Sequence, residues 1–187
     1  MKNQTHFFYA IKIPDETKEL LNLQCQKLKE HVIFKRWVHP QDLHITLAFL
    51  GHAPMDQLES SKKKVLDALS GSNEVSIEIT KLGTFGSKES PRIFWAGMKE
   101  NTELNQIRNQ VFSACEKAGF QLESRPFKPH ITLARKWAGE QPFRETLLDA
   151  WYSLQPIPIQ FTATEVVLYE THMENTPKYE IKEVFPL

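Results

Sequence analysis

Cysteine is scarce in this chain, with two residues among 187, and neither belongs to a Cys-x-x-Cys pair or a Cys/His cluster. Cys25 and Cys115 both fall inside helical patterns. We therefore expect two buried free thiols and no zinc site, because structural zinc needs several clustered Cys or His ligands.

Long apolar runs are also missing. No segment approaches the roughly 18 residues that a membrane span requires. The first residues, MKNQTHFFYAIKIP, lack the apolar core and the small-residue cleavage site of a secretory signal. These absences predict a cytoplasmic protein that has no membrane partner.

The chain has no excess of either charge, because 23 Lys and Arg residues balance 23 Asp and Glu residues. This balance argues against bulk, non-specific binding of nucleic acid by a basic surface, but it leaves room for a local basic pocket that binds one phosphate. Hydrophobic residues make up 41% of the chain, as in ordinary globular proteins. We expect a monomer with one domain over residues 1–187, large enough to bury a sizeable core.

One tetrapeptide, His-Ile-Thr-Leu, occurs twice, at residues 44–47 and 130–133, an offset of 86 residues (130 − 44). At the same offset, Phe-Phe-Tyr-Ala at 7–10 falls on Ile-Phe-Trp-Ala at 93–96, which is apolar throughout and identical at two positions. Recurrence at one shared offset predicts an internal duplication, with halves at roughly 5–85 and 91–170.

The order of the expected elements supports a duplication. Strands are expected at residues 5–12, 42–50, 75–82, 92–98, 130–135 and 158–162, with a closing hairpin within 164–185. Helices are expected after Pro14 and at 55–69, 102–118 and 140–152, the middle two ending at Gly71 and Gly119. We predict an α+β fold: a bilobal pseudo-twofold duplication, each lobe with a mainly antiparallel sheet and outer helices, and a groove between the lobes.

Each motif, written on a strand, places its histidine and threonine on one face and its two aliphatic residues on the other. His44 and Thr46 would then face the groove, as would His130 and Thr132. Two imidazoles with pKa values near ~6.5 can take a proton from water and give one to a leaving oxygen. Threonine hydroxyls can donate to an oxyanion, and neither motif holds the carboxylates of a two-metal site. The pattern predicts metal-free acid–base chemistry without a cofactor, with phosphodiester hydrolysis as the natural candidate.

Arg135 follows the second motif and is a candidate phosphate ligand, because a guanidinium can bind phosphate through two hydrogen bonds. On a flat strand it has the wrong parity for the face of His130. A twist or a bulge at the strand end would turn it toward the groove.

Four aromatic residues have two possible roles. Trp37 and Phe127 flank the motifs and could stack on a base or pack in the core. Tyr9 and Trp95, which match at the repeat offset, could line the groove floor or belong to the core. His39 lies in the loop before the first motif; a surface loop is expected, and approach to a ligand is the alternative.

The paired motifs resemble the 2H phosphoesterase superfamily, and their surroundings resemble its branch of RNA 2′,3′-cyclic phosphodiesterases, also called 2′-5′ RNA ligase-like proteins. The resemblance covers nearly the whole chain. It is carried by FFYAIKIP at 7–14, WVHP at 37–40, LHITL at 43–47 with FLG at 49–51, LGTFG at 82–86, RPFKPHITLAR at 125–135, VLYE at 167–170 and Tyr179.

The resemblance implies hydrolysis of a terminal ribose 2′,3′-cyclic phosphate to a 2′-phosphate in a central cleft. His44 would donate a proton to the leaving 3′-oxygen and His130 would accept one from water, while Thr46, Thr132 and Arg135 would hold the phosphate. The partners would be RNA ends or nucleotides that carry a 2′,3′-cyclic phosphate. Three alternatives stay open: a 2′-5′ RNA ligase running the reverse reaction, a module that binds such ends without turnover, and a metal-binding protein with paired histidines.

Overall fold

The computed structural model describes residues 5–154 and 158–187, so residues 1–4 and 155–157 of the predicted domain lie outside the description. Within the described ranges, strands form one sheet in the order β7-β4-β5-β6-β3-β1-β8-β9, and β2 also pairs with β6. The strands are β1 (Phe7–Lys12), β2 (Phe34–Trp37), β3 (His44–Gly51), β4 (Val75–Gly86), β5 (Pro91–Met98), β6 (His130–Trp137), β7 (Ile159–Ala163), β8 (Glu165–Thr171) and β9 (Tyr179–Pro186). Each pairing between them is antiparallel, which confirms the predicted fold class.

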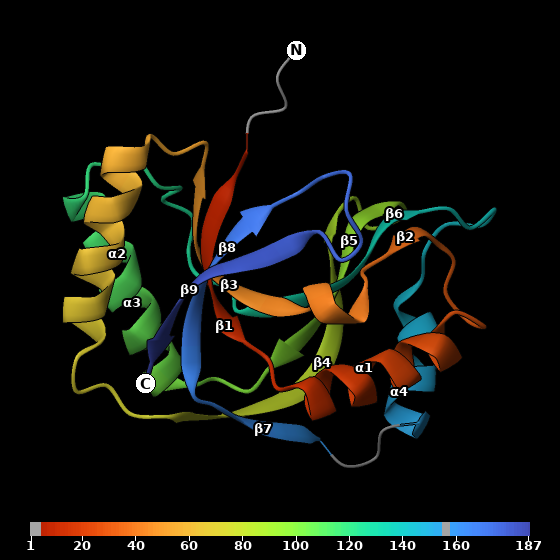
Figure 1. The fold of residues 1–187 in the computed structure, drawn as a ribbon. Coiled ribbons are helices and arrows are strands. Elements are labelled where there is room, and N and C mark those ends of the chain that lie inside the picture. The colour runs from red at the N-terminus through yellow and green to blue at the C-terminus, as the bar shows by residue number, and fades with distance from the viewer. Residues whose placement is uncertain (1–4, 155–157) are drawn as a thin grey trace.

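Two groups of strands meet in the middle of the sheet, β7-β4-β5-β6 on one side and β3-β1-β8-β9 on the other (Figure 1). The two motif strands, β3 and β6, are the ones that touch, and they pair at one position, Ile45 opposite Ile131. The order of strands in the sheet does not follow the order in the chain. Strand β4 pairs with β5, the next strand along the chain, whereas β8, near the C-terminus, pairs with β1, near the N-terminus.

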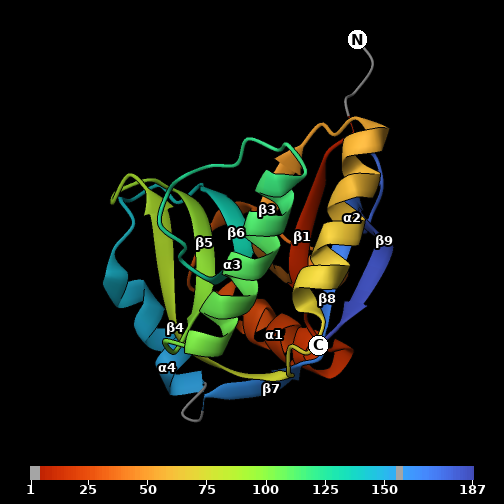
Figure 2. The same ribbon diagram turned by 90° about the vertical axis from the view of Figure 1, so that its left-hand side faces the viewer.

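The helices cover the two groups in pairs (Figure 2). Helices α2 (Met55–Leu69) and α3 (Thr102–Lys117) lie side by side, with α3 against β3 and α2 against β9, whereas α1 (Asp15–Leu28) lies against α4 (Asp149–Leu154) and β7. On α3 the buried residues recur at helical spacing, and Asn101 caps the helix by accepting from the Leu104 amide at 2.9 Å. No helix in the described parts of the chain is long and apolar enough to cross a membrane.

Two local predictions about secondary structure were incomplete. The helix expected at 140–152 begins later, with a 3₁₀ turn, η2 (Glu145–Leu148), before α4. The Phe143 amide instead donates to the Glu89 carbonyl at 2.8 Å, and its ring packs on Trp137 in the core. Strand β2 was not predicted, because its four residues carry two charges and alternate too briefly to give a pattern.

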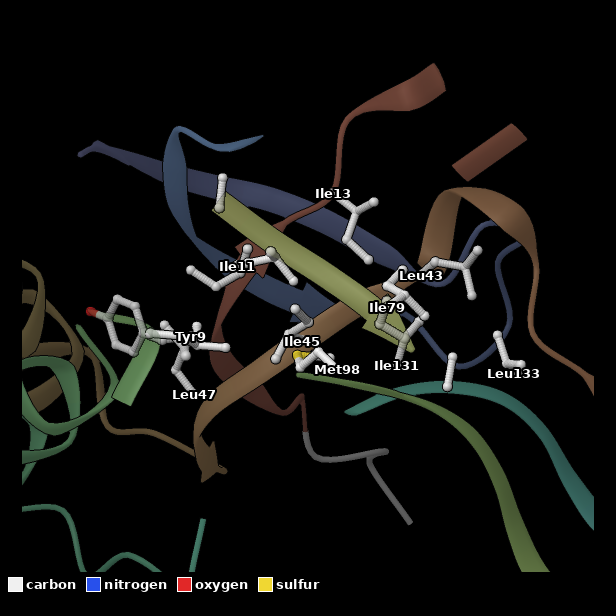
Figure 3. Packing of buried hydrophobic residues seen from close by; sticks show 14 of the residues in the cluster. Tyr9, Ile11, Ile13, Leu43, Ile45, Leu47, Ile79, Met98, Ile131 and Leu133 are labelled. Atoms are coloured by element: carbon white, nitrogen blue, oxygen red, sulfur yellow. The ribbon is translucent and has the colours of Figure 1, made fainter. Parts of the chain in front are cut away.

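The aliphatic residues of both motifs enter one core (Figure 3). Ile45 and Ile131 are fully buried beside Ile11, Ile79 and Met98. Both cysteines are buried and free, as expected, and burial raises the pKa of each thiol to about 12. Because the aliphatic faces point inward, the histidines and threonines of the two motifs share the opposite face.

Both motif strands carry a β-bulge at the same place. On β3, Thr46 pairs with Ala10 and Ala48 with Tyr9, so Leu47 is the extra residue. On β6, Thr132 pairs with Trp95 and Ala134 with Phe94, so Leu133 is the extra residue. The repeat therefore extends from the residue types to an irregularity of the backbone.

Strands β1 and β5, which pair with the motif strands β3 and β6, are related by 85 residues (94 − 9) and not by 86, because Tyr9 and Phe94 occupy equivalent places. A one-residue shift moves every side chain of a strand to the other face. The alignment of residues 7–10 with 93–96 was therefore wrong by one residue. Tyr9 is a core residue with 0% exposure, whereas Trp95 lies on the groove side.

The buried hydroxyl of Tyr9 gives a test of this packing. Ser61 on α2 donates to the Leu58 carbonyl at 2.7 Å, so Tyr9 donates to Ser61 at 2.8 Å. We expect Tyr9→Phe to cost about 1 kcal/mol, the net value of one hydrogen bond. Ser61→Ala should cost more, about 1–3 kcal/mol, because it leaves a buried donor unpaired. Urea denaturation measures both, and equal costs would contradict this assignment of donor and acceptor.

Candidate active site

The register of β3 against β6 brings the four motif side chains together. Continuing the Ile45–Ile131 pairing by one residue in each direction places His44 across from Thr132 and Thr46 across from His130. Residues that face each other in this way have Cβ atoms about 5 Å apart, and diagonal neighbours such as the two histidines are about 7–8 Å apart. All four side chains are partly buried. Each histidine therefore has the threonine of the other motif beside it.

The two imidazoles are held in the same tautomer. Nδ1 of His44 lies 2.7 Å from the Asp42 carbonyl, and Nδ1 of His130 lies 2.7 Å from the Lys128 carbonyl. A carbonyl only accepts, so Nδ1 carries the hydrogen in both rings. Nε2 of His44 lies 3.1 Å from the Thr46 hydroxyl. In the neutral ring Nε2 is the acceptor of this bond from the Thr46 hydroxyl, and it is the ring nitrogen left for acid–base chemistry.

Burial lowers the pKa of both histidines. The pKa of His44 falls to about 4, mainly because burial disfavours the charged ring; its bond to the Asp42 carbonyl and the Asp42 carboxylate act against this, and the charges of His130 and Arg135 add to it. The pKa of His130 is lowered by burial and by Arg135, against its bond to the Lys128 carbonyl. In the free protein both rings are neutral at pH 7, and a bound anion would favour their protonated forms.

Aromatic rings enclose His44. Its ring centroid lies 4.8 Å from that of Phe8, 5.2 Å from Tyr179 and 5.9 Å from Tyr169. Tyr179 meets the imidazole edge to face, and Phe8 and Tyr169 belong to a small buried cluster on this side of the sheet. The apolar wall explains why burial dominates the pKa of His44.

His130 has a different aromatic surround. Phe85 contacts it edge to face at 5.0 Å, and Trp95 lies 6.3 Å away between centroids. A Cβ on Gly83 or Gly97 would come within 2.3 or 2.6 Å of the Trp95 ring, so both positions must lack a side chain. The repeat offset matched Tyr9 with Trp95. Of these two, Trp95 lies beside His130, whereas Tyr9 is buried in the core.

Asp42 connects the His44 segment to a distant part of the chain. It ends the 3₁₀ turn η1 (Pro40–Asp42) and is 5% exposed. Its carboxylate accepts from the Lys178 amide at 3.0 Å and from the Tyr179 amide at 3.1 Å. These bonds hold the start of β9, and with it the Tyr179 ring, against His44. Sequence reasoning missed Asp42, because its partners lie 136 and 137 residues away.

Arg135 lies on the same face as Thr132. Their partners on β5 are Ile93 and Trp95, two residues apart, because the bulge at Leu133 corrects the parity. A twist or a bulge was the condition expected for Arg135 to face the groove, and the structure has the bulge. Its side chain is exposed at the end of the motif strand.

A cavity of about 180 Å³ opens beside His44, between β2, η1, β6 and the start of β9. Its lining includes Arg36, Trp37, His39, His44, Thr132, Arg135 and Lys178. Trp37 is thus a cavity residue, and Lys29 lies 5.3 Å above its ring. Phe127 packs against the core and the Arg108 guanidinium instead. His39, expected in a surface loop, is half-buried and lines the cavity.

One group of potential metal ligands lies on the β8–β9 hairpin, where ligand atoms of Glu170, His172 and Glu180 fall within 4.8 Å of one another. Lys182 pairs with Glu170 at 3.0 Å and with Glu180 at 3.4 Å. Because Lys182 already pairs with both carboxylates, the hairpin forms a surface ion-pair network and gives no support for a metal centre.

Known proteins resemble this chain in sequence and in fold. The RNA 2′,3′-cyclic phosphodiesterase of Geobacillus stearothermophilus is 42% identical over 184 residues, which are 98% of this chain and 58% of that relative. The protein of the same name from Bacillus subtilis is 34% identical over 175 residues, 94% of this chain and 92% of the relative. The structure of Escherichia coli LigT complexed with 3′-AMP has a TM-score of 0.76 at 24% identity and covers 98% of both chains.

Residues 17–175 match the 2′-5′ RNA ligase superfamily. The chain belongs to that superfamily, which confirms the resemblance inferred from the two motifs. It spans little more than half the length of the G. stearothermophilus relative and nearly the whole of the B. subtilis one.

The bonds of Asp42 predict a large effect of one isosteric substitution. In Asp42→Asn, one side-chain oxygen accepts where two did before. The new NH2 group is a donor, and it faces backbone N–H groups that are also donors. We expect a loss of about 1–3 kcal/mol of unfolding free energy, as for unsatisfied buried groups. Urea denaturation measures it, with Asp67→Asn on the exposed face of α2 as the matched control. Equal stability of the two variants would contradict the role given to Asp42.

The lowered pKa of His44 predicts that stability depends on pH. The unfolded ring binds a proton near pH ~6.5, whereas the folded ring resists protonation until about pH 4. The contribution of His44 is therefore complete above pH ~6.5 and is lost as the pH falls toward 4. We expect His44→Gln to flatten this part of the curve of unfolding free energy against pH. An unchanged slope would contradict the neutral state of His44, and His52→Gln controls for the loss of an exposed imidazole.

Proposed function

We propose that the protein hydrolyses 2′,3′-cyclic phosphates at RNA or nucleoside ends to 2′-phosphates. The observation that carries this proposal is the pair of Nδ1-protonated imidazoles, supplied by adjacent antiparallel strands, each beside the threonine of the other motif. The names of the relatives from G. stearothermophilus and B. subtilis support the same substrate. Simple anion binding would not need two matched proton-transfer groups.

The proposed reaction is a displacement at phosphorus. Nε2 of His130 takes a proton from water while the water oxygen bonds to phosphorus. The bond from phosphorus to the 3′-oxygen breaks, and protonated His44 gives its Nε2 proton to that oxygen. The phosphate stays on the 2′-oxygen. Solvent then returns both imidazoles to their starting states.

His44 starts this cycle protonated only when substrate is bound. The neutral ring of the free protein becomes easier to protonate once an anion lies beside it. The Asp42 carboxylate also favours the charged form of His44, whereas no carboxylate of the described residues acts on the pKa of His130. Burial nevertheless lowers the pKa of His44 to about 4, so the two pKa shifts do not decide between the roles; the assignment of His44 as the acid and His130 as the base rests on the family resemblance.

The phosphate would be held by three groups on the groove face. The hydroxyls of Thr46 and Thr132 can each donate to a non-bridging oxygen, one beside each histidine. The exposed guanidinium of Arg135 adds a charge-assisted contact from the end of β6. All three favour the extra negative charge that develops at phosphorus when water attacks.

The decisive experiment uses a nucleoside 2′,3′-cyclic phosphate in the presence of EDTA, with the products separated by chromatography. We expect a 2′-phosphate product, and we expect His44→Ala and His130→Ala each to lower kcat by about 10²–10⁴-fold, the usual value of a general acid or base. His52→Ala, which removes an exposed imidazole outside the groove, is the matched control. Full activity in either motif variant would refute the mechanism.

The same assay separates the alternatives. RNA fragments with a 5′-hydroxyl and a cyclic phosphate end report ligation, because a 2′-5′-linked product would form in place of the 2′-phosphate. Tight binding without any product would indicate a binding module. Activity that EDTA abolishes would indicate a metal-dependent reaction.

A further inference from the structure

The cavity beside His44 is rich in positive charge. Arg36 and Arg135 face each other across β2 and β6, and both side chains are exposed and line the cavity. Neither forms an ion pair or a side-chain hydrogen bond with any residue that the structure describes. Like charges that face each other across strands are destabilising. Lys178 adds a third cation from the turn before β9.

The cavity offers an anion many donors and no free carboxylate. Asp42 is the one acid among its described lining residues, and its oxygens already accept from the Lys178 and Tyr179 amides. Nδ1 of His39 accepts from the Gln41 amide at 3.2 Å, so its Nε2 carries the hydrogen in the neutral ring. The cavity therefore suits an anion better than a cation or an uncharged base.

The cavity lies on one side of the histidine pair. Strand β6 runs from His130 past Thr132, which faces His44, to Arg135, so the cavity opens at the end of β6 remote from His130. In the proposed displacement, water lies beside His130, and the 3′-oxygen with its ribose lies beside His44. A ribose beside His44 would adjoin the cavity, because His44 itself lines it.

We propose that this cavity binds the phosphate on the 5′-oxygen of the terminal nucleoside, with Arg36 and Lys178 as its ligands. In RNA that phosphate joins the terminal nucleoside to the preceding nucleotide. The protein then selects the 3′ end of an RNA chain over a free nucleoside cyclic phosphate. The inference rests on the proposed function, because the roles of His44 and His130 place the ribose beside His44.

The test compares uridine 2′,3′-cyclic phosphate with the same molecule carrying a 5′-phosphate. We expect kcat/KM to be about 10-fold higher with the 5′-phosphate, the value of one charge-assisted contact, and the advantage to shrink as salt rises. Arg36→Gln should bring the ratio of the two kcat/KM values toward one, and Arg36→Lys should restore part of it. Lys35→Gln is the matched control: it removes an exposed charge from the same strand, outside the cavity.

A binding measurement makes the result independent of turnover. Calorimetry compares uridine 2′-phosphate with uridine 2′,5′-bisphosphate, and the same ratio of affinities should depend on Arg36. A wild-type protein that gains nothing from the 5′-phosphate, or equal effects of the Arg36 and Lys35 variants, would overturn the inference. If the bisphosphate binds more tightly through Arg36 but neither cyclic phosphate is hydrolysed, the proposed hydrolysis fails and the 5′-phosphate site stands.

Discussion

The contact between Ile45 and Ile131 is the constraint on which the groove depends. Both side chains are fully buried, and their pairing is the position at which the two motif strands meet. Strand alternation then puts each histidine and threonine on the other face. A slip of one residue in either strand would bury a histidine and expose an isoleucine. The arrangement of polar groups in the groove is thus set by the packing of apolar groups beneath it.

Two copies of one motif acquire different properties because their neighbours differ. His44 lies among Phe8, Tyr169 and Tyr179, with a buried carboxylate nearby, whereas His130 lies beside Phe85 and Trp95. Two equal imidazoles would exchange the roles of acid and base freely. Part of the asymmetry comes from a segment outside the repeat, the start of β9, which Asp42 holds so that Tyr179 contacts His44.

The sequence predicted the features that depend on local alternation. The motif faces and the α+β class were predicted, and the structure has both; a twist or a bulge was the condition for Arg135 to face the groove, and the structure has a bulge at Leu133. Features that depend on register or on distant partners were not predictable. Tyr9 was aligned one residue out, because a shared offset does not reveal a bulge in a motif strand. Asp42 was placed at the start of the expected strand at 42–50 and given no role, since one sequence does not show which amides will meet it.

The interleaved order of strands has a consequence for synthesis on the ribosome. The group β4-β5-β6-β7 is contiguous in the chain apart from its helices, so it can pair while translation continues. Strands β1 and β3 emerge first and pair with each other, but the other edge of β1 stays unpaired until β8 and then β9 have been synthesised. Of the two motif histidines, His44 is translated first, yet its surroundings are completed last, when β8 and β9 pair beside β1.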